Sequence, residues 1–332
     1  MNLSPIVRML LWPLSAVYGR LAWLRAAFYE RGMLKQKRLS RPVISVGNLT
    51  VGGTGKTPMV IWLAERLLAK GLRVSILSRG YKGSGGTSDE IELMKLRLNN
   101  RVTFGVGSDR FEEGRHMEAS ADVFLLDDGF QHLQLARDVD ILLIDAARSL
   151  GREMMLPTGR LREPVSAMSR ADFLLFTRAE TVPGTIAAIN KLQLYPVFSA
   201  ATQLVGFRRL GESIQILQAE EIGAGPFYAF CGIGNPRAFF LDLQNWGTAV
   251  AGKCEFADHH RYDARDAREL ESAARQAGAR ALVTTEKDEQ NLSDVKFGEM
   301  PVYVVVIDLA IDKEEAFLQA VQERLHARRL VI

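Results

Sequence analysis

The residues best suited to chemistry lie in the stretch SVGNLTVGGTGKTPMV, residues 45–60, which carries Gly-Lys-Thr at residues 55–57. A glycine, four residues and then Gly-Lys-Thr or Gly-Lys-Ser form a phosphate-binding loop, in which backbone N–H groups surround phosphate oxygens and the lysine reaches the outer phosphates. Here the first glycine position holds Thr50, and further glycines stand at Gly52 and Gly53. The stretch is therefore either a variant phosphate loop or a glycine-rich turn without a ligand.

The segments on either side of this loop favour the phosphate site. RPVISVGN, residues 41–48, is a short apolar run typical of a buried parallel strand, and residues 57–71 carry apolar side chains at helical spacing. At a helix N-terminus, unsatisfied N–H groups and the helix dipole attract anions, and the hydroxyl of Thr57 is placed to bind Mg²⁺. The predicted nucleotide-binding residues are Thr50, Gly52, Gly53, Thr54, Gly55, Lys56 and Thr57.

Polar residues follow the next two predicted strands. GLRVSILSRGY, residues 71–81, ends in Ser78, Arg79 and Tyr81, and ADVFLLDDGFQH, residues 121–132, places Asp127 and Asp128 after an apolar run. In doubly wound sheets ligands gather at the carboxyl ends of the strands, and nucleotide enzymes hold Mg²⁺ with a strand-end acid. Many strands also end in a solvated aspartate, but downstream of a phosphate loop we expect Asp127 and Asp128 to form the metal site with Thr57.

Strands and helices alternate along the rest of the chain, which predicts an α/β fold with a doubly wound, mainly parallel sheet. With 332 residues, 47% of them hydrophobic, the chain can bury two cores. LVGFRRLGESIQIL, residues 204–217, alternates like a hairpin and is the candidate linker. The predicted parts are a helix in residues 1–30, a phosphate-loop domain in 31–200, a linker in 201–225 and a smaller α/β domain in 226–332.

Two polar segments keep more than one interpretation. LPTGRLREP, residues 156–164, has no hydrophobic period and carries Arg160, Arg162 and Glu163, so it is either a loop that faces a substrate or a solvated connector. FADHHRY, residues 256–262, is a surface turn, a metal site or a place where a histidine orients an acid or shares its proton. A metal is disfavoured there because no further histidine or cysteine stands at ligand spacing.

The N-terminal 41 residues hold eight Lys and Arg against one acid, Glu30. Trp12, Tyr18 and Trp23 accompany apolar side chains at helical spacing, and a basic tail follows. The longest charge-free run, between Arg8 and Arg20, is shorter than the roughly 18 residues that read as a membrane-spanning segment. We expect a helix that lies in a membrane interface, with a cleaved signal peptide and a helix docked on its own domain as alternatives. The apolar positions are Leu10, Leu14, Val17, Leu21, Leu24 and Phe28.

Composition adds little to these assignments. The net charge of +3 over the whole chain gives no indication of a nucleic-acid partner, and no obligate protein partner is indicated. Cys231 and Cys254 are the only cysteines, which provides no disulfide framework and fits a reducing compartment.

Several motifs together resemble those of the tetraacyldisaccharide 4′-kinases, the lipid A kinases of Gram-negative bacteria. The resemblance runs from about residue 5 to residue 310, and in that family a threonine at the first-glycine position of the loop is usual. The basic amphipathic N-terminus fits as well. The matching motifs, in order, are VGNLTVGGTGKTP, LSRGY, Asp89-Glu90, DDGFQH, LARDVDILLID, LPTGRLREP, ADHH and TEKD.

The resemblance implies an enzyme that uses ATP and Mg²⁺ to phosphorylate the 4′-hydroxyl of tetraacyldisaccharide 1-phosphate, giving lipid IVA, at the cytoplasmic face of the inner membrane. It implies that an Asp paired with a His activates the acceptor hydroxyl, and these roles fall on Asp89 and His259, with Lys56 as the loop lysine. The implied substrate-binding residues are Arg79, Tyr81, Glu90, Arg110 and His132.

The main alternative is a membrane-recruited nucleotide switch of the partitioning-ATPase kind, whose loop reads Lys-Gly-Gly-x-Gly-Lys-Thr. The leading lysine is Val51 here, which weakens that hypothesis. A small-molecule kinase or ligase of the same fold is a further alternative, in which the N-terminal helix would have no evident purpose.

Overall fold

The computed structural model describes residues 4–80, 88–148, 150–179, 196–212, 215–223 and 225–329. The chain divides into two compact units, and β7 and β11 each begin in one of them and end in the other. The first unit comprises Met1–Tyr81, Leu98–Ala201 and Leu309–Ile332, and the second comprises Lys82–Arg97 and Thr202–Asp308.

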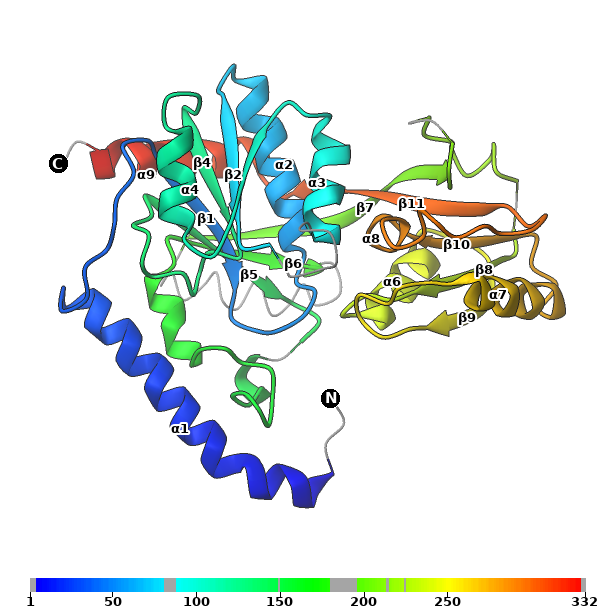
Figure 1. Ribbon diagram of the computed structural model, residues 1–332, viewed down its shortest axis with the longest axis horizontal. Helices are drawn as coiled ribbons and strands as arrows, with labels where there is room; N and C mark the ends of the chain where they lie inside the picture. The colour runs from blue at the N-terminus through cyan, green and yellow to red at the C-terminus, as the bar shows by residue number, and fades with distance from the viewer. Residues whose placement is uncertain are drawn as a thin grey trace. The chain divides into compact units, whose positions relative to one another are not determined.

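The first unit is built on a parallel sheet with the strand order β3-β2-β4-β1-β5-β6-β7 (Figure 1). The strand β1 lies between β4 and β5, and every pairing between β3 and β6 is parallel. This confirms the predicted α/β class with a mainly parallel sheet. The strands are β1 (Val43–Asn48), β2 (Val74–Ser78), β3 (Thr103–Val106), β4 (Val123–Asp127), β5 (Val139–Asp145), β6 (Phe173–Thr177) and β7 (Val197–Arg209).

Most strands of this sheet are buried along their whole length, because helices follow the strands and cover them. The C-terminal helix α9 inserts Phe317 between Trp62 of α2 and Phe198 of β7, with ring centroids 6.0 and 4.9 Å away. Within the described residues, the helices of this unit are α1 (Pro5–Glu30), α2 (Lys56–Ala69), α4 (Arg110–Met117) and α9 (Glu314–Arg329), with short 3₁₀ turns η1 (Leu150–Arg152) and η2 (Val165–Arg170).

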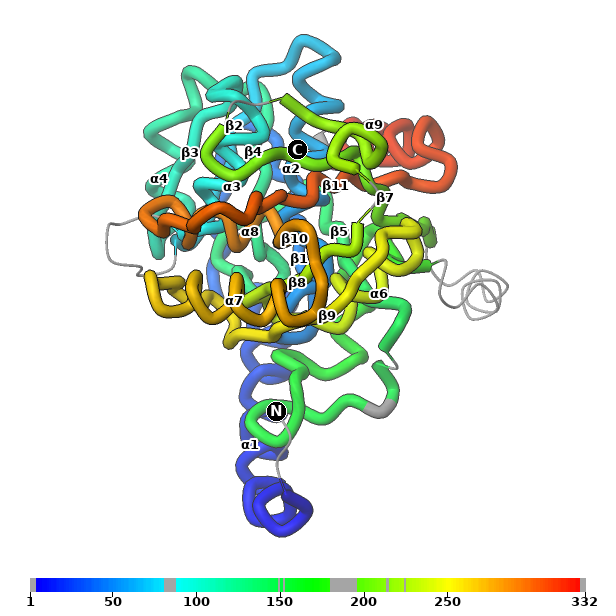
Figure 2. The backbone as a smooth tube through the Cα atoms, turned by 90° about the vertical axis from the view of Figure 1, so that its right-hand side faces the viewer, coloured from blue at the N-terminus to red at the C-terminus, as the bar shows by residue number. Residues whose placement is uncertain are grey.

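The helix α1 lies beside the segment that connects β5 to β6 (Figures 1 and 2). Its buried residues are small, Ser15, Gly19, Ala26 and Ala27, whereas most of its large apolar side chains are exposed. The hydroxyls of Ser15 and Thr158 are 2.8 Å apart. The helix therefore docks through a narrow face of small residues and presents its apolar bulk to the surroundings.

The second unit has its own parallel strands, in the order β7-β11-β10-β8-β9. Phe207 and Leu217 form a backbone pair at 2.8 and 2.7 Å, so the hairpin-like pairing predicted for residues 204–217 is present. The elements are α3 (Asp89–Leu98), β8 (Phe227–Cys231), α6 (Pro236–Asn245), β9 (Val250–Glu255), α7 (Ala264–Gln276), β10 (Ala281–Thr285), α8 (Glu286–Glu289) and β11 (Val302–Ile311).

This division differs from the predicted boundaries, since the predicted linker belongs to the second unit from residue 202 onward and two further segments change units. Residues 82–97, with most of α3, belong to the second unit, where Arg97 binds the buried Glu286 at 2.9 Å. Residues 309–332 belong to the first unit, where Phe317 of α9 fills its core. Both exchanges depend on which surface an amphipathic helix covers, and the hydrophobic pattern of a helix does not specify its partner.

Candidate active site

The phosphate loop connects β1, which ends at Asn48, to α2, which begins at Lys56. Gly52 and Gly55 have φ values of +103° and +85°, which only glycine adopts without strain. Residue 55 is the N-cap of α2, and it has no side chain to satisfy the N–H groups of the first turn. These N–H groups and the amino group of Lys56 are the donors that a phosphate requires at this position.

Neighbouring segments fix the backbone of this loop. The guanidinium of Arg160 donates to the carbonyl of Val51 at 3.0 and 2.6 Å, and the N–H of Val51 donates to the carbonyl of Arg160 at 2.8 Å. Thr54 is held from both sides: the amide of Asn48 donates to its hydroxyl at 2.7 Å, and the hydroxyl of Thr177 donates to its carbonyl at 3.1 Å. The loop is therefore preorganised by its surroundings.

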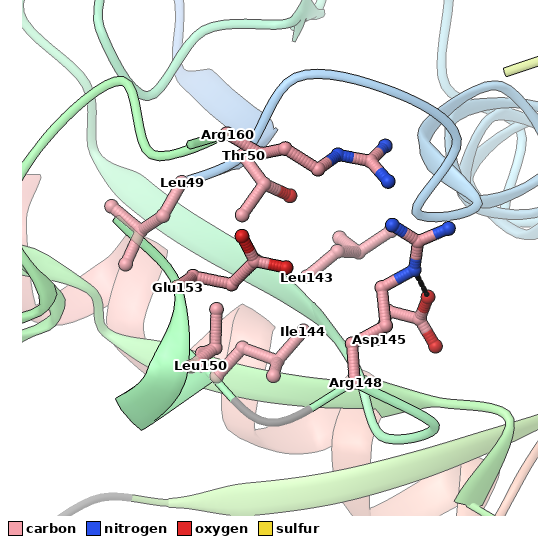
Figure 3. Close-up of a pocket in the computed structure, with 9 residues that line it drawn as sticks. All are labelled: Leu49, Thr50, Leu143, Ile144, Asp145, Arg148, Leu150, Glu153 and Arg160. Atoms are coloured by element: carbon pink, nitrogen blue, oxygen red, sulfur yellow. Dashed lines mark ion pairs between the residues drawn. The ribbon is translucent and has the colours of Figure 1, made fainter. Parts of the chain in front are cut away.

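A cavity adjoins Leu49 and Thr50 at the start of this loop, and both apolar and charged side chains line it (Figure 3). Arg148 binds Asp145 there at 3.0 Å, and Arg160 extends over Thr50. Lys56 and Thr57 do not line this cavity. Its lining residues therefore stabilise the loop backbone and are not the residues that would bind phosphate. It is lined by Leu49, Thr50, Leu143, Ile144, Asp145, Arg148, Leu150, Glu153 and Arg160.

The two strand-end acids have different environments. Asp128 has a φ of +48° and forms a two-pronged ion pair with Arg162, at 2.7 Å from each carboxylate oxygen, while Lys56 lies 3.5 Å away. Burial raises the pKa of Asp128, but the hydrogen bonds and charges of Arg162 and Lys56 outweigh it and hold this pKa well below its usual range. Asp128 is therefore an ionised carboxylate that orients Lys56 and Arg162.

Asp127 ends β4 and is buried, with the hydroxyl of Ser78 donating to its carboxylate at 3.1 Å. The register of β1 and β4 pairs Val46 with Asp127, which sets this carboxylate beside the strand that leads into the phosphate loop. Within the described residues, no three His, Cys, Asp or Glu side chains form a group that could enclose a metal by themselves. A cation at this edge would share its shell between protein oxygens and phosphate.

Arg110 and His132 form a buried pair in the first unit, with Nη1 of Arg110 donating to Nδ1 of His132 at 2.8 Å. Burial and the charges of Arg110 and Arg137 lower the pKa of His132 to about 4, so its ring is neutral and carries its proton on Nε2. Nε of Arg110 and Nε2 of His132 are buried donors for which the described part of the chain provides no hydrogen-bond partner. Two such donors, one of them on a charged guanidinium, are typical of a site that binds an anion.

Asp89 and His259 meet within the second unit. Asp89 begins α3, and its Oδ2 lies 2.8 Å from Nδ1 of His259, with the Asp89 side chain 8% and the His259 side chain 46% exposed. Burial raises the pKa of Asp89, but the hydrogen bond from His259 and the charge of Lys287 bring it below its ordinary value. The hydrogen bond with Asp89 raises the pKa of His259, against opposition from burial and Lys287.

The adjacent histidine has a different partner, because His260 Nε2 lies 2.8 Å from Asp266 Oδ2. Glu90 follows Asp89 on α3 and lies 3.8 Å from the amino group of Lys287. Arg79 follows β2 with an exposed side chain, and Tyr81 lies outside the described residues.

Two residues that contact the predicted site residues, Arg162 and Lys287, were not themselves predicted as site residues. Arg162 stands in LPTGRLREP, which allowed a substrate loop or a solvated connector; instead it binds Asp128 and the side-chain oxygen of Asn48, and Glu163 is buried against Arg170. Lys287 stands in TEKD and faces the Asp89–His259 pair. An arginine or lysine inside a polar, non-periodic motif was the available signal in both cases.

Comparisons with known proteins found similar sequences over most of the chain. A family model described as Tetraacyldisaccharide-1-P 4′-kinase matches residues 7–326. A tetraacyldisaccharide 4′-kinase from Geobacter sulfurreducens is 40% identical over 316 residues, which cover 89% of this chain and 87% of the relative. One from Geobacter metallireducens is 39% identical over 330 residues, which cover 93% of this chain and 96% of the relative.

One solved structure is similar over nearly the whole chain. It is the crystal structure of the "apo" form of LpxK from Aquifex aeolicus in complex with ATP, with a TM-score of 0.74 and 31% identity, covering 96% of this chain and 99% of that one.

Proposed function

Because the chain belongs to the tetraacyldisaccharide-1-P 4′-kinase family, we propose an assignment of the transfer reaction to its individual residues. The protein is an ATP-dependent kinase that phosphorylates the 4′-hydroxyl of tetraacyldisaccharide 1-phosphate and gives lipid IVA. The partitioning-ATPase alternative is not favoured, since the family match extends far beyond the phosphate loop. In the reaction the bond between the γ-phosphorus and the β–γ bridging oxygen breaks, a bond to the 4′-oxygen forms, and the hydroxyl proton must leave.

The nucleotide phosphates are assigned to residues 50–57 of the first unit. The open N–H groups at the start of α2 and the amino group of Lys56 supply the positive field that transfer requires. The carboxylate of Asp128 lies 3.5 Å from the amino group of Lys56 and is itself held by Arg162 at 2.7 Å, so that Lys56 is oriented before the nucleotide arrives.

Mg²⁺ is assigned to the hydroxyl of Thr57 and the carboxylate of Asp127. Both are oxygen ligands, and Mg²⁺ in proteins is usually bound by one or two carboxylates together with phosphate oxygens and water. Asp128 is the weaker candidate because Arg162 occupies both of its oxygens. When bound, the ion neutralises charge on the phosphates.

Asp89 is assigned as the base for the 4′-hydroxyl. The observation that supports this role is its 2.8 Å contact with His259, which keeps one carboxylate of α3 ionised and oriented. A hydroxyl has too high a pKa to ionise alone at neutral pH, so a carboxylate within hydrogen-bond distance is needed to accept its proton as it attacks.

The anionic group of the lipid is assigned to Arg110 and His132. Their unsatisfied Nε and Nε2 groups are donors that a phosphate oxygen would satisfy. The buried guanidinium supplies charge, and the neutral imidazole supplies a directed N–H. Arg79 and Glu90 are assigned to the same substrate from the family motif.

Membrane association is assigned to α1 and the basic segment after it. Among the described residues, none of the helices combines the length and the apolar character that crossing a bilayer requires. Met9 and Leu10 of α1 are 72% and 70% exposed, and a groove lined by Pro5, Arg8, Met9, Trp12 and Met154 opens beside them. An apolar face flanked by basic residues suits the anionic surface of the cytoplasmic leaflet, where the lipid substrate resides.

Replacement of the base tests this assignment. Asp89→Asn keeps the side chain's size and removes its ability to accept the proton, so kcat should fall roughly 10² to 10⁴-fold while ATP binding stays unchanged. Glu92→Gln, three residues on in α3, is the matched control and should leave kcat unchanged. Normal turnover of Asp89→Asn would remove Asp89 from the reaction.

A further inference from the structure

Lys287 lies at the centre of the charged groups around the Asp89–His259 pair. Its amino group is 3.2 Å from Oδ1 of Asp258, 3.8 Å from Oε1 of Glu90 and 3.9 Å from Oδ2 of Asp89. The same amino group is 3.4 Å from Nε2 of His259. The Lys287 side chain is 20% exposed, and all of these groups belong to the second unit.

The contact with Nε2 indicates which tautomer a neutral His259 adopts. An ammonium group has three N–H donors and no acceptor, so Nε2 must accept the hydrogen bond with its lone pair. The ring proton of a neutral imidazole then stands on Nδ1, from which it is donated to the carboxylate of Asp89 at 2.8 Å. One chain of donors therefore runs from Lys287 through His259 to Asp89.

We propose that Lys287 is a positioning residue of the kinase, which holds His259 as a neutral imidazole with its Nδ1–H directed at Asp89. This inference rests on the proposed role of Asp89 as base. With Nδ1 protonated and Nε2 accepting from Lys287, the imidazole has no position for the hydroxyl proton. His259 therefore orients the carboxylate, and the proton of the acceptor hydroxyl stays on Asp89.

The neighbouring charges are consistent with this arrangement. Burial lowers the pKa of Lys287, but the carboxylates of Glu90, Asp89 and Asp258 outweigh it, so the pKa is raised and the ammonium persists. Asp258 lies 3.8 Å from Nε2 of His259 and favours the imidazolium, whereas the positive charge of Lys287 disfavours it. The ammonium of Lys287 faces three carboxylates at this pair, those of Asp89, Glu90 and Asp258.

The residues beside Lys287 in α8 fix its position. Glu286 binds Arg97 of α3 at 2.9 Å, so the helix that carries Asp89 is attached to α8. Asp288 accepts a hydrogen bond from the N–H of Gly232 at 2.7 Å, and the carbonyl of Gly232 accepts from the N–H of His259 at 3.0 Å. The backbone of His259 has a φ of +60°, a conformation that needs such support.

The test uses the full-length protein and the variants Lys287→Met and Lys287→Arg. Long-range ¹H–¹⁵N spectra of the imidazole should show a protonated Nδ1 and an unprotonated Nε2 in the wild type at neutral pH. Lys287→Met should raise the titration midpoint of His259 and lower kcat roughly tenfold to a hundredfold, the scale of a misplaced catalytic group, with the KM for ATP unchanged. Lys287→Arg keeps the charge and should recover part of kcat and most of the midpoint.

Lys95→Met is the matched control, because Lys95 stands on α3, as Asp89 does, but binds Glu92 at 2.9 Å. It should change neither the midpoint nor kcat. A wild-type spectrum with a protonated Nε2 at neutral pH would overturn the proposal without any variant, as would an unchanged midpoint in Lys287→Met. If Lys287→Met does not fold, Lys287→Gln replaces it with the same expected midpoint shift and the same refutation.

The failures of the two proposals are distinguishable. Full turnover of Asp89→Asn would refute the base assignment, on which this inference depends. Impaired turnover of Asp89→Asn together with normal turnover of Lys287→Met would refute only the role of Lys287.

Discussion

Removing both members of the Asp89–His259 pair should cost hardly more turnover than removing Asp89 alone. If His259 acts only through the carboxylate of Asp89, the imidazole has nothing to orient once that carboxylate is gone. The losses in Asp89→Ala and His259→Ala should therefore not add.

The magnitude follows from the contact. A hydrogen bond at 2.8 Å to a carboxylate that is 8% exposed is of the charge-assisted kind, worth about 1.5 to 3 kcal/mol. At about 1.4 kcal/mol for each factor of ten, His259→Ala should lower kcat roughly tenfold to a hundredfold. Asp89→Ala removes the base itself and should lower kcat roughly 10² to 10⁴-fold.

The assay measures kcat and the KM for ATP of the wild type, both single variants and the double variant with the lipid substrate in detergent micelles. His260→Ala is the matched control, since His260 binds Asp266 at 2.8 Å and should leave kcat nearly unchanged. Losses that multiply fully in the double variant would refute the idea that the two residues act as a unit. A more damaging His260→Ala than His259→Ala would show that the wrong histidine is assigned.

The pH dependence gives a second readout of the same pair. Asp89 must be ionised to act, and its pKa lies below its ordinary value. The acid limb, the loss of kcat/KM as the pH is lowered, should therefore have its midpoint below about pH 3.9, the usual pKa of an aspartate. His259→Ala removes the hydrogen bond that lowers this pKa, and the acid limb should move to higher pH. A limb that stays in place or moves to lower pH would contradict the assigned contact.

Three further predictions concern the phosphate loop, the helix α1 and its docking. Lys56→Ala should lower kcat by two to three orders of magnitude, roughly the value of one charged transition-state donor, with an unchanged circular-dichroism spectrum; near-normal turnover would exclude residues 50–57 as the nucleotide site. Leu10→Ser should weaken binding to anionic vesicles about tenfold or more, because the 70% exposed leucine is worth about 1.5 to 3 kcal/mol when buried in the interface; equal retention in a sedimentation assay would count against membrane contact through this face. Thr158→Val should lower the free energy of unfolding by about 1 kcal/mol, because the buried 2.8 Å contact with Ser15 is lost, and an unchanged urea midpoint would show that this contact does not hold α1.

The parts of the fold that depend on local pattern were predictable from the sequence. The strand, loop and helix of residues 41–71 were identified because glycine positions and apolar periodicity are local signals, and the structure places them as β1, the loop and α2. The assignment of residues 82–97 and 309–332 was not predictable in this way. It depends on pairs such as Arg97 with Glu286 and Phe317 with Phe198, which join residues far apart in the chain.

The candidate site follows the same division. Residue types and strand ends drew attention to Lys56, Asp127 and Asp128, whereas the pairing of Asp89 with His259 came from a family resemblance. Asp89 and His259 are 170 positions apart in the sequence, so no local sequence pattern indicates that they pair. The roles of Arg162 and Lys287 depend on contacts with partners across the fold, so a polar motif could only mark them as positions of interest.

The measurement that tests the account most directly follows the γ-phosphate of labelled ATP. The purified protein is incubated with Mg²⁺ and either tetraacyldisaccharide 1-phosphate in detergent or detergent alone, and the lipid is analysed by mass spectrometry with the phosphorylated position determined by fragmentation. The account predicts label on the 4′-position of the lipid and little ATP hydrolysis without it. ATP hydrolysis at the same rate with and without lipid, and no labelled lipid, would contradict it.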